Sequence, residues 1–192
     1  MDISVQDLFT KGRTCHDFTS DPVPQELLEE IYNITKFGPT SANGSPLRIK
    51  FVSSDSARQK LIGCVMEGNI ASIKNAPITA IFAYDLKFYE KMDILFPHNP
   101  GIKGFFANDE KTGKETAFRN SALQAAYFMV VARSKGLGLG PMSGFDADKL
   151  DAVFFPNTSL RSNFICTIGY PTSDVKYERL PRLDFKSVCE MV

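Results

Sequence analysis

The sequence is poor in the residues that bind metal ions or form disulfides. Its 192 residues include only two histidines, far apart in the chain, and four cysteines without a Cys-x-x-Cys pair. Zinc and iron sites need such ligands at short spacings, so the sequence predicts no dedicated metal centre. A domain of this length can bury an adequate core without disulfides, and we therefore expect all four cysteines to be reduced thiols.

A charge excess and long apolar runs are also absent. The 22 basic and 22 acidic residues cancel and are scattered, unlike the charge pattern of a protein that binds nucleic acid or an anionic membrane. Residues 121–132 carry no charge, but about a dozen residues are fewer than the ~18 of a membrane span. The first residues, Met-Asp-Ile-Ser-Val-Gln-Asp, lack the basic and apolar regions of an export signal, so we expect a cytoplasmic protein.

A loop of small polar residues, 38–48, is the most informative stretch that is present: Gly-Pro-Thr-Ser-Ala-Asn-Gly-Ser-Pro-Leu-Arg. It follows a segment, 24–37, in which apolar residues recur at helical spacing. Pro39 and Pro46 fix the backbone on both sides of three hydroxyls and one amide. Two interpretations are open, a loop that holds a polar ligand and an ordinary capped turn.

The rest of the chain alternates between strand and helix patterns. Three apolar stretches, 48–53, 78–84 and 163–169, predict strands, and Ser54 predicts the cap of a helix that begins near Asp55. The elements therefore indicate a single domain that contains both helices and strands.

The charge-free run 121–132 predicts a central helix that is buried on nearly all sides. Burial all round a helix of a small protein indicates a subunit interface. Residues 170–183 have the composition of an extended segment held by Pro171 and Pro181. Cys15 is either a small apolar filler or a reactive thiolate.

Residues 84–115 form a segment dense in Phe, Pro, Gly and Lys, without a clear helix or strand pattern. Long structureless connections in compact domains usually have a function. We expect this segment to be a mobile cover over a substrate site. A surface excursion packed by its own aromatic residues is the alternative.

Other ligand-binding and catalytic motifs do not fit. Gly136, Gly138 and Gly140 lack the third glycine and the strand-turn-helix context of a dinucleotide-binding fingerprint. Ser143 is one residue out of step with a hydrolase nucleophile elbow, and no P-loop is present. The glycines around position 140 instead allow a backbone to approach a planar ligand closely.

Five motifs, in order along the chain, resemble those of the FMN-dependent nitroreductase superfamily. They are Arg-Thr-Cys-His-Asp-Phe (13–18) followed by Pro22-Val23, Pro-Thr-Ser-Ala-Asn-Gly-Ser-Pro (39–46), Gly68-Asn69, Gly-Pro-Met-Ser-Gly-Phe-Asp (140–146) and Arg-Leu-Pro-Arg (179–182). The resemblance covers nearly the whole chain. It implies an α+β fold over residues 1–192, a three-layer α-β-α sandwich with a mixed, mainly antiparallel sheet, assembled as an intertwined homodimer with FMN at the interface.

The resemblance also implies roles for individual residues. Arg13 and Arg179, with Arg182 as a third cation, would clamp the FMN phosphate, which guanidinium groups bind bidentately. The backbone N–H of Gly144 would face flavin N5 and stabilise the charge that shifts during hydride transfer. His16 departs from the motif, because the wider superfamily has a second basic residue there. The other cofactor-binding residues that the resemblance implies are Thr14, Ser41, Asn43, Asn69 and Met142.

The implied activity is the NAD(P)H-dependent reduction of a small organic acceptor in two half-reactions. Residues 115–121, among other stretches, resemble the malonic semialdehyde reductases of bacterial pyrimidine degradation, which implies reduction of malonic semialdehyde to 3-hydroxypropionate. A broad nitroaromatic or quinone reductase and a flavin-binding redox module without turnover are the alternatives. For a carboxylate-bearing aldehyde, Arg119 and Lys103 are the candidate carboxylate ligands, Arg119 first because it borders the charge-free run.

Overall fold

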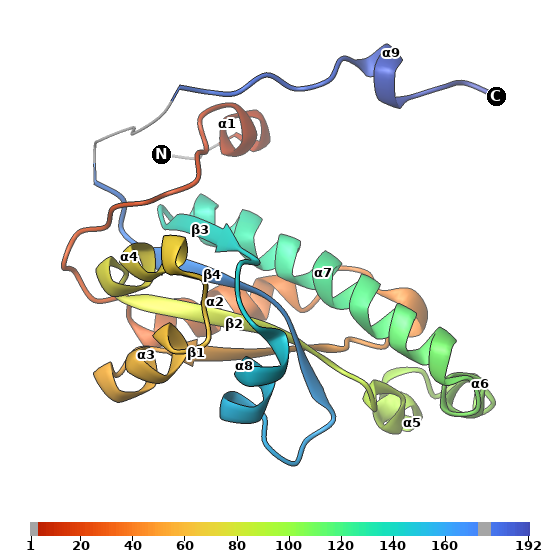
Figure 1. Ribbon diagram of the computed structural model, residues 1–192. Coiled ribbons are helices and arrows are strands. Elements are labelled where there is room, and N and C mark those ends of the chain that lie inside the picture. The colour runs from red at the N-terminus through yellow and green to blue at the C-terminus, as the bar shows by residue number, and fades with distance from the viewer. Residues whose placement is uncertain (1–3, 173–177) are drawn as a thin grey trace.

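The computed structural model describes residues 4–172 and 178–192, and a four-stranded sheet lies at its centre (Figure 1). The strand order is β1-β2-β4-β3, and every neighbouring pair is antiparallel. Within the described residues, parallel pairing is limited to one bridge between Thr14 and Leu139 at the β3 edge. The predicted α+β class with a mainly antiparallel sheet is confirmed. The strands are β1 (Leu47–Val52), β2 (Ile78–Asp85), β3 (Gly138–Met142) and β4 (Leu160–Gly169).

Helices cover both faces of the sheet and make three layers (Figure 1). The core on one face joins α2 (Gln25–Thr35) and α7 (Glu110–Ser134) to the strands. The core on the other face joins α3 (Asp55–Ile62), α4 (Glu67–Asn75) and α8 (Ala147–Phe154) to the same strands. The predicted cap of α3 is confirmed, because Ser54 Oγ accepts a hydrogen bond from the N–H of Ala57 at 3.3 Å.

Strand β2 is central because both of its faces are apolar. Alternate side chains of a strand point to opposite sides of the sheet. Phe82 accordingly joins the core with α7, where its ring lies 5.7 Å from that of Phe128, and its neighbour Ile81 joins the core with α3 and α8. The predicted strands agree with β1, β2 and β4 to within three residues at each end.

Helix α7 is buried on one side only within a single chain. Its inward residues Ala125, Phe128 and Ala132 are completely buried, whereas Phe118 and Leu123 are about half exposed. The expectation of burial on nearly all sides is therefore not met by one chain alone. Among the described residues, no helix combines the length and the apolar character needed to cross a membrane.

The segment 84–115 is helical, so the expectation of a structureless connection is wrong. After β2 come η2 (Phe88–Lys91), α5 (Met92–Leu95), α6 (Ile102–Ala107) and the first turn of α7. We call residues 88–107 the helical cap. Its residues Phe88, Met92 and Phe106 are almost completely buried, which means that the cap packs against the body through its own apolar side chains.

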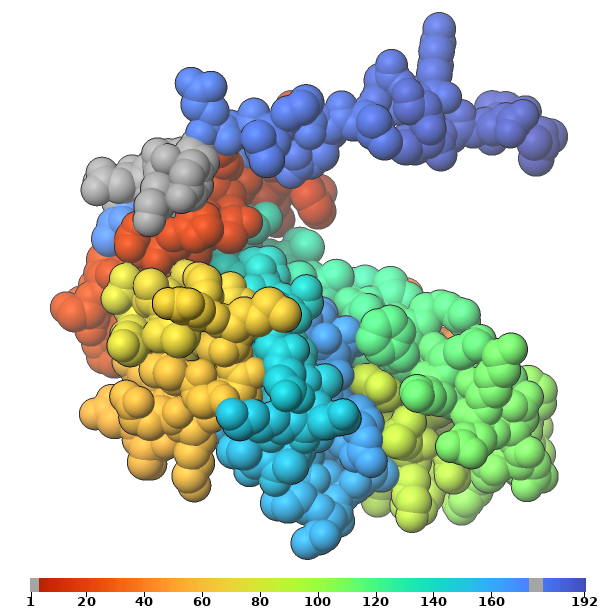
Figure 2. Space-filling view, viewed as in Figure 1, coloured from red at the N-terminus to blue at the C-terminus, as the bar shows by residue number. Residues whose placement is uncertain are grey.

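Both ends of the described chain lie beyond the same edge of the sheet. Helix α1 (Val5–Thr10) lies above β3, and residues 178–192, which we call the C-terminal arm, run past it and end beyond the short helix α9 (Phe185–Val188) (Figure 1). The arm stands off the body with open space beneath it (Figure 2). Part of the predicted extended segment, 173–177, lies outside the described residues; the described parts carry no helix or strand apart from a bridge at Pro171. The arm exposes six large apolar side chains: Leu180, Leu183, Phe185, Val188, Met191 and Val192.

Candidate functional site

The loop between α2 and β1 has an unusual backbone. Ala42, Asn43 and Ser45 have φ values of 49°, 53° and 42°, in the left-handed region that non-glycine residues rarely adopt. Each such residue costs of order 1 kcal/mol, and structures retain such strain mainly at functional sites, where surrounding contacts hold it. This geometry favours a ligand-holding loop over an ordinary capped turn.

The contacts that hold this loop come from distant parts of the chain. Asn120 of α7 is buried, and its Oδ1 accepts a hydrogen bond from the N–H of Ser41 at 2.8 Å. Asn43 Nδ2 donates to the carbonyl of Leu95 in the helical cap at 2.8 Å, and the N–H of Ser45 donates to Thr40 Oγ1 at 3.2 Å. The loop is thus fastened to α7 and to the cap at once.

The segment that contains Arg13 and Thr14 lies along the opposite end of α7. The N–H of Cys15 donates to the carbonyl of Leu139 at 2.8 Å, which adds the segment to the edge of β3. Arg179 of the C-terminal arm donates through Nη2 to the carbonyls of Thr10, at 2.7 Å, and Gly12, at 2.9 Å. Two of the predicted phosphate ligands, Arg13 and Arg179, are therefore brought to one place.

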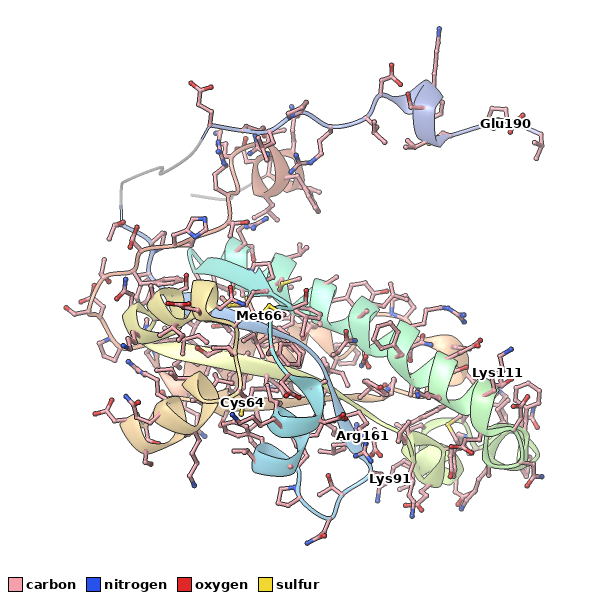
Figure 3. The ribbon with its side chains drawn as sticks, in the orientation of Figure 1. Cys64, Met66, Lys91, Lys111, Arg161 and Glu190 are labelled. Atoms are coloured by element: carbon pink, nitrogen blue, oxygen red, sulfur yellow. The ribbon has the colours of Figure 1, made fainter. Side chains whose placement is uncertain are left out.

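Gly144 follows β3 by two residues and is oriented by the start of α4. Its carbonyl accepts hydrogen bonds from the N–H of Met66 and from Asn69 Nδ2, both at 2.9 Å; Figure 3 labels Met66 at this position. A Cβ at position 144 would lie 2.7 Å from Asn69 Nδ2, so only glycine fits without a shift. Within residues 4–172 and 178–192, no group accepts a hydrogen bond from the N–H of Gly144.

The sequence-predicted residues thus form two groups within one chain. The first group lies along strand β3 and its end, and it comprises Arg13, Thr14, Asn69, Gly144 and Arg179. The second group is the strained loop, which contacts α7 at Asn120. The first group contacts α7 near Arg133, about 20 Å further along the helix axis at 1.5 Å per residue.

The chain is similar to known proteins over most of its length. The model of the family described as "Nitroreductase family" matches residues 10–170. A protein of Ralstonia pickettii named "Putative NADH dehydrogenase/NAD(P)H nitroreductase HadB" is 46% identical over 191 residues, covering 98% of this chain and 97% of its own. The chain belongs to the nitroreductase family. A Caulobacter vibrioides relative named "Putative NADH dehydrogenase/NAD(P)H nitroreductase" is 44% identical over 191 residues and covers 100% of this chain and 97% of its own.

Solved structures of nitroreductase-like proteins share the fold. One from Exiguobacterium sibiricum, described as a nitroreductase in complex with FMN, has a TM-score of 0.88 at 18% identity and covers 98% of this chain and 97% of its own. An enone reductase of gut-bacterial fatty acid metabolism has a TM-score of 0.83 at 17% identity, covering 98% and 97%. At these identities the likeness concerns the fold alone.

The remaining predicted residues of this nitroreductase-family chain lie in several places. Met142 ends β3 and packs into the core with α3 and α8. Arg182 donates to carbonyls of its own arm segment. Arg119 is exposed on α7 beside Asn120, and Lys103 in the helical cap pairs with Asp93 at 2.8 Å. These contacts leave the cofactor roles of Met142 and Arg182 as predictions.

Two residues that sequence reasoning assigned no role hold the site from α7. Asn120 lies inside the 115–121 motif, so the motif itself was the available signal. Arg133 follows the charge-free run, and its Nη1 donates to the carbonyl of Leu8 at 3.1 Å. Its partner is 125 residues away, and no local pattern indicates the contact.

The cysteine beside the site is a poor nucleophile. Burial raises the pKa of the Cys15 thiol, and its Sγ donates to the carbonyl of Asp17 at 3.1 Å. A thiol in this setting stays protonated at neutral pH, which favours the filler interpretation. In the described part of the chain, no three His, Cys, Asp or Glu side chains are grouped to hold a metal ion.

Proposed function

We propose that this chain binds FMN and reduces a small organic acceptor with electrons from NAD(P)H. The observation that carries the proposal is the backbone of Gly144, whose N–H lacks an acceptor within the described residues and whose carbonyl is held by two donors. The relatives' names include NAD(P)H nitroreductase, and a fold neighbour is described in complex with FMN. Both support the proposal.

The residues along β3 fit an elongated, planar ligand with a phosphate at one end. Thr14 pairs with Leu139, and Gly144 lies five residues further on, at most about 17 Å away along extended chain. The cationic end contains Arg13 and Arg179, which suit a phosphate. At the other end lies Gly144, whose N–H lacks an acceptor within the described residues and whose backbone packs closely against Asn69, 2.7 Å from where a Cβ would be. A flavin mononucleotide has a phosphate at one end and a ring with hydrogen-bond acceptors at the other.

Bound FMN would supply the hydride-transfer chemistry between the nicotinamide and the acceptor. The residues of this chain would bind and orient it. Arg13, Thr14 and Arg179 would hold the phosphate. Asn69 and Met66 hold the Gly144 carbonyl and so restrain the backbone of Gly144, whose N–H would then face the ligand.

We also propose a homodimer in which each site takes residues from both chains. Ser41 and Asn43 lie at the opposite end of α7 from the phosphate group, so a ligand held along β3 of one chain cannot meet them in the same chain. A second copy packed in the reverse direction on the exposed, charge-free side of α7 would bring its loop to the site. The apolar C-terminal arm supplies further surface for the same partner.

The proposed acceptor is malonic semialdehyde, reduced to 3-hydroxypropionate, with Arg119 as the ligand of its carboxylate. Arg119 is exposed close to the strained loop and has no ion pair or side-chain hydrogen bond within the described residues. Lys103 is paired with Asp93, and this hydrogen bond raises the pKa of its ammonium group. The free cation of Arg119 therefore suits a substrate carboxylate better.

The first test is whether the purified protein is yellow, takes up one FMN per chain and oxidises NAD(P)H when an acceptor is added. A colourless protein that takes up no FMN would overturn the proposal. A yellow protein without turnover towards any aldehyde, nitroaromatic or quinone would favour the redox-module alternative.

The second test compares Arg119→Ala with Lys103→Ala. We expect Arg119→Ala to lower kcat/KM for malonic semialdehyde about tenfold or more, a loss near 1.4 kcal/mol, with little change for nitroaromatics. Lys103→Ala should leave both activities nearly unchanged. If Arg119→Ala lowers both activities together, Arg119 is structural. If the unchanged protein ignores the semialdehyde and reduces nitroaromatics well, the broad-specificity alternative replaces this one.

A further inference from the structure

Arg133 joins two parts of the chain that the proposed cofactor site depends on. It lies in the last turn of α7, half-buried, and reaches across to α1. Its Nη1 donates to the carbonyl of Leu8 at 3.1 Å. The last carbonyls of a helix have no partner within the helix, so a guanidinium from another element satisfies one of them.

Gly12 provides the room for this contact. A Cβ at position 12 would lie 2.8 Å from Cδ and from Nη1 of Arg133, and 2.3 Å from the carbonyl oxygen of Leu8. Any larger residue would therefore displace both the carbonyl of Leu8 and the guanidinium of Arg133, and so separate the two. Residue 12, immediately before Arg13, must therefore be glycine for the contact between Arg133 and Leu8 to form as observed.

The segment that carries Arg13 and Thr14 is held on both sides. On one side Cys15 is hydrogen-bonded to Leu139 in β3. On the other side the end of α1 is held by Arg133 from the body of the protein and by Arg179 from the C-terminal arm. Of these two arginines, Arg133 belongs to the rigid helix α7, so it sets where α1 ends.

We propose that Arg133 is a positioning residue of the cofactor site, which holds the 10–15 segment so that Arg13 and Thr14 can bind a terminal phosphate. This inference rests on the proposed function. Arg133 does not itself need to touch the ligand, because it acts on the backbone at Leu8, five and six residues before Arg13 and Thr14. Loss of the contact should weaken recognition of the phosphate and spare the ring.

FMN and riboflavin separate these two effects, because riboflavin has the same ring and chain but no phosphate. We would titrate the apoprotein with each flavin and follow the quenching of flavin fluorescence. For Arg133→Ala we expect the Kd for FMN to rise about tenfold and the Kd for riboflavin to stay within about twofold. Arg133→Lys should recover part of the loss, because an ammonium can still donate to Leu8.

Gly12→Ala is the second variant, since it should displace the guanidinium while Arg133 itself is kept. Arg161→Ala is the matched control, because Arg161 also donates to backbone carbonyls, those of Thr158 and Leu160, on another part of the molecule. We expect Gly12→Ala to reproduce the selective loss of FMN affinity and Arg161→Ala to leave both affinities unchanged.

The outcomes distinguish the inference from the proposed function. The inference is overturned, and the proposed function is not, if both Arg133→Ala and Gly12→Ala bind FMN normally with an unchanged ratio of the two Kd values. An equal rise for both flavins also overturns it, since that is the result of general destabilisation. Failure of the unchanged protein to bind either flavin overturns the proposed function and the inference with it. If Arg133→Ala does not fold, Gly12→Ala and Arg133→Lys decide the question.

Discussion

Because the loop backbone is strained, replacing Ala42 with glycine should leave the free energy of unfolding nearly unchanged or raise it. The same replacement in the interior of a helix should lower it. Ala42 has φ 49° and ψ 31°, a conformation that costs an alanine roughly 1–2 kcal/mol. Glycine removes this cost. Two terms oppose the gain: the greater entropy of the unfolded chain lowers the free energy of unfolding by about 0.5–1 kcal/mol, and loss of a half-buried methyl group lowers it by about 0.4 kcal/mol. The free energy of unfolding should therefore change by between about −0.4 and +1.1 kcal/mol.

Ala152 is the matched control. It is exposed in the interior of α8, where replacement by glycine should lower the free energy of unfolding by about 1 kcal/mol. Urea unfolding at one protein concentration would measure both variants. With a slope of about 2 kcal/mol per molar urea, the two midpoints should differ by roughly 0.3–1 M. If Ala42→Gly destabilises as much as Ala152→Gly, the loop is not strained and the reasoning from its backbone fails.

Three further predictions concern the ligand site, the assembly and the buried thiols. Gly144→Ala should lower stability by about 1–3 kcal/mol, because its methyl group would lie 2.7 Å from Asn69 Nδ2, and should weaken FMN binding in titrations. Sedimentation should give twice the chain mass of 21.3 kDa, and a chain that ends at Thr172 should shift towards monomer. Burial raises the pKa of Cys166 from 9.0 to about 12. The unfolded chain therefore ionises first, and stability should fall between about pH 9 and pH 12, less so in Cys166→Ala; iodoacetamide at pH 8 should modify exposed Cys189 and spare Cys166.

Much of the fold could be predicted because its central strands and helices have strong local patterns. Strand β3 was the exception. Its sequence, Gly-Leu-Gly-Pro-Met, contains residues that disfavour strands, and only an edge position lets a sheet accept such a proline. Pairing with β4 selects this strand, and that pairing joins parts of the chain that are distant in sequence. The short helices of the cap were missed for a similar reason, since four to six residues are too few to show a period.

The site could be predicted only as a set of motifs, without the contacts between them. The motif residues Asn69 and Gly144 do meet, and their hydrogen bond gives a physical reason for both. The sequence could not indicate that Asn43 would reach Leu95, or that Arg133 would reach Leu8, because each pair is more than 50 residues apart. Nor could it indicate that the predicted cofactor ligands would lie at two ends of one helix.

The position of the C-terminal arm has a consequence for the order of events during synthesis. All four strands and α7 are complete by Gly169, so the ribosome has made the whole sheet and both cores before it makes the arm. Domains begin to fold while the chain is still growing. The body can therefore fold during translation, before the ribosome has made the arm, which carries Arg179 and the exposed apolar residues. Assembly through the arm would then be a meeting of two bodies that are already folded, with the cofactor site as the last part of the molecule to form.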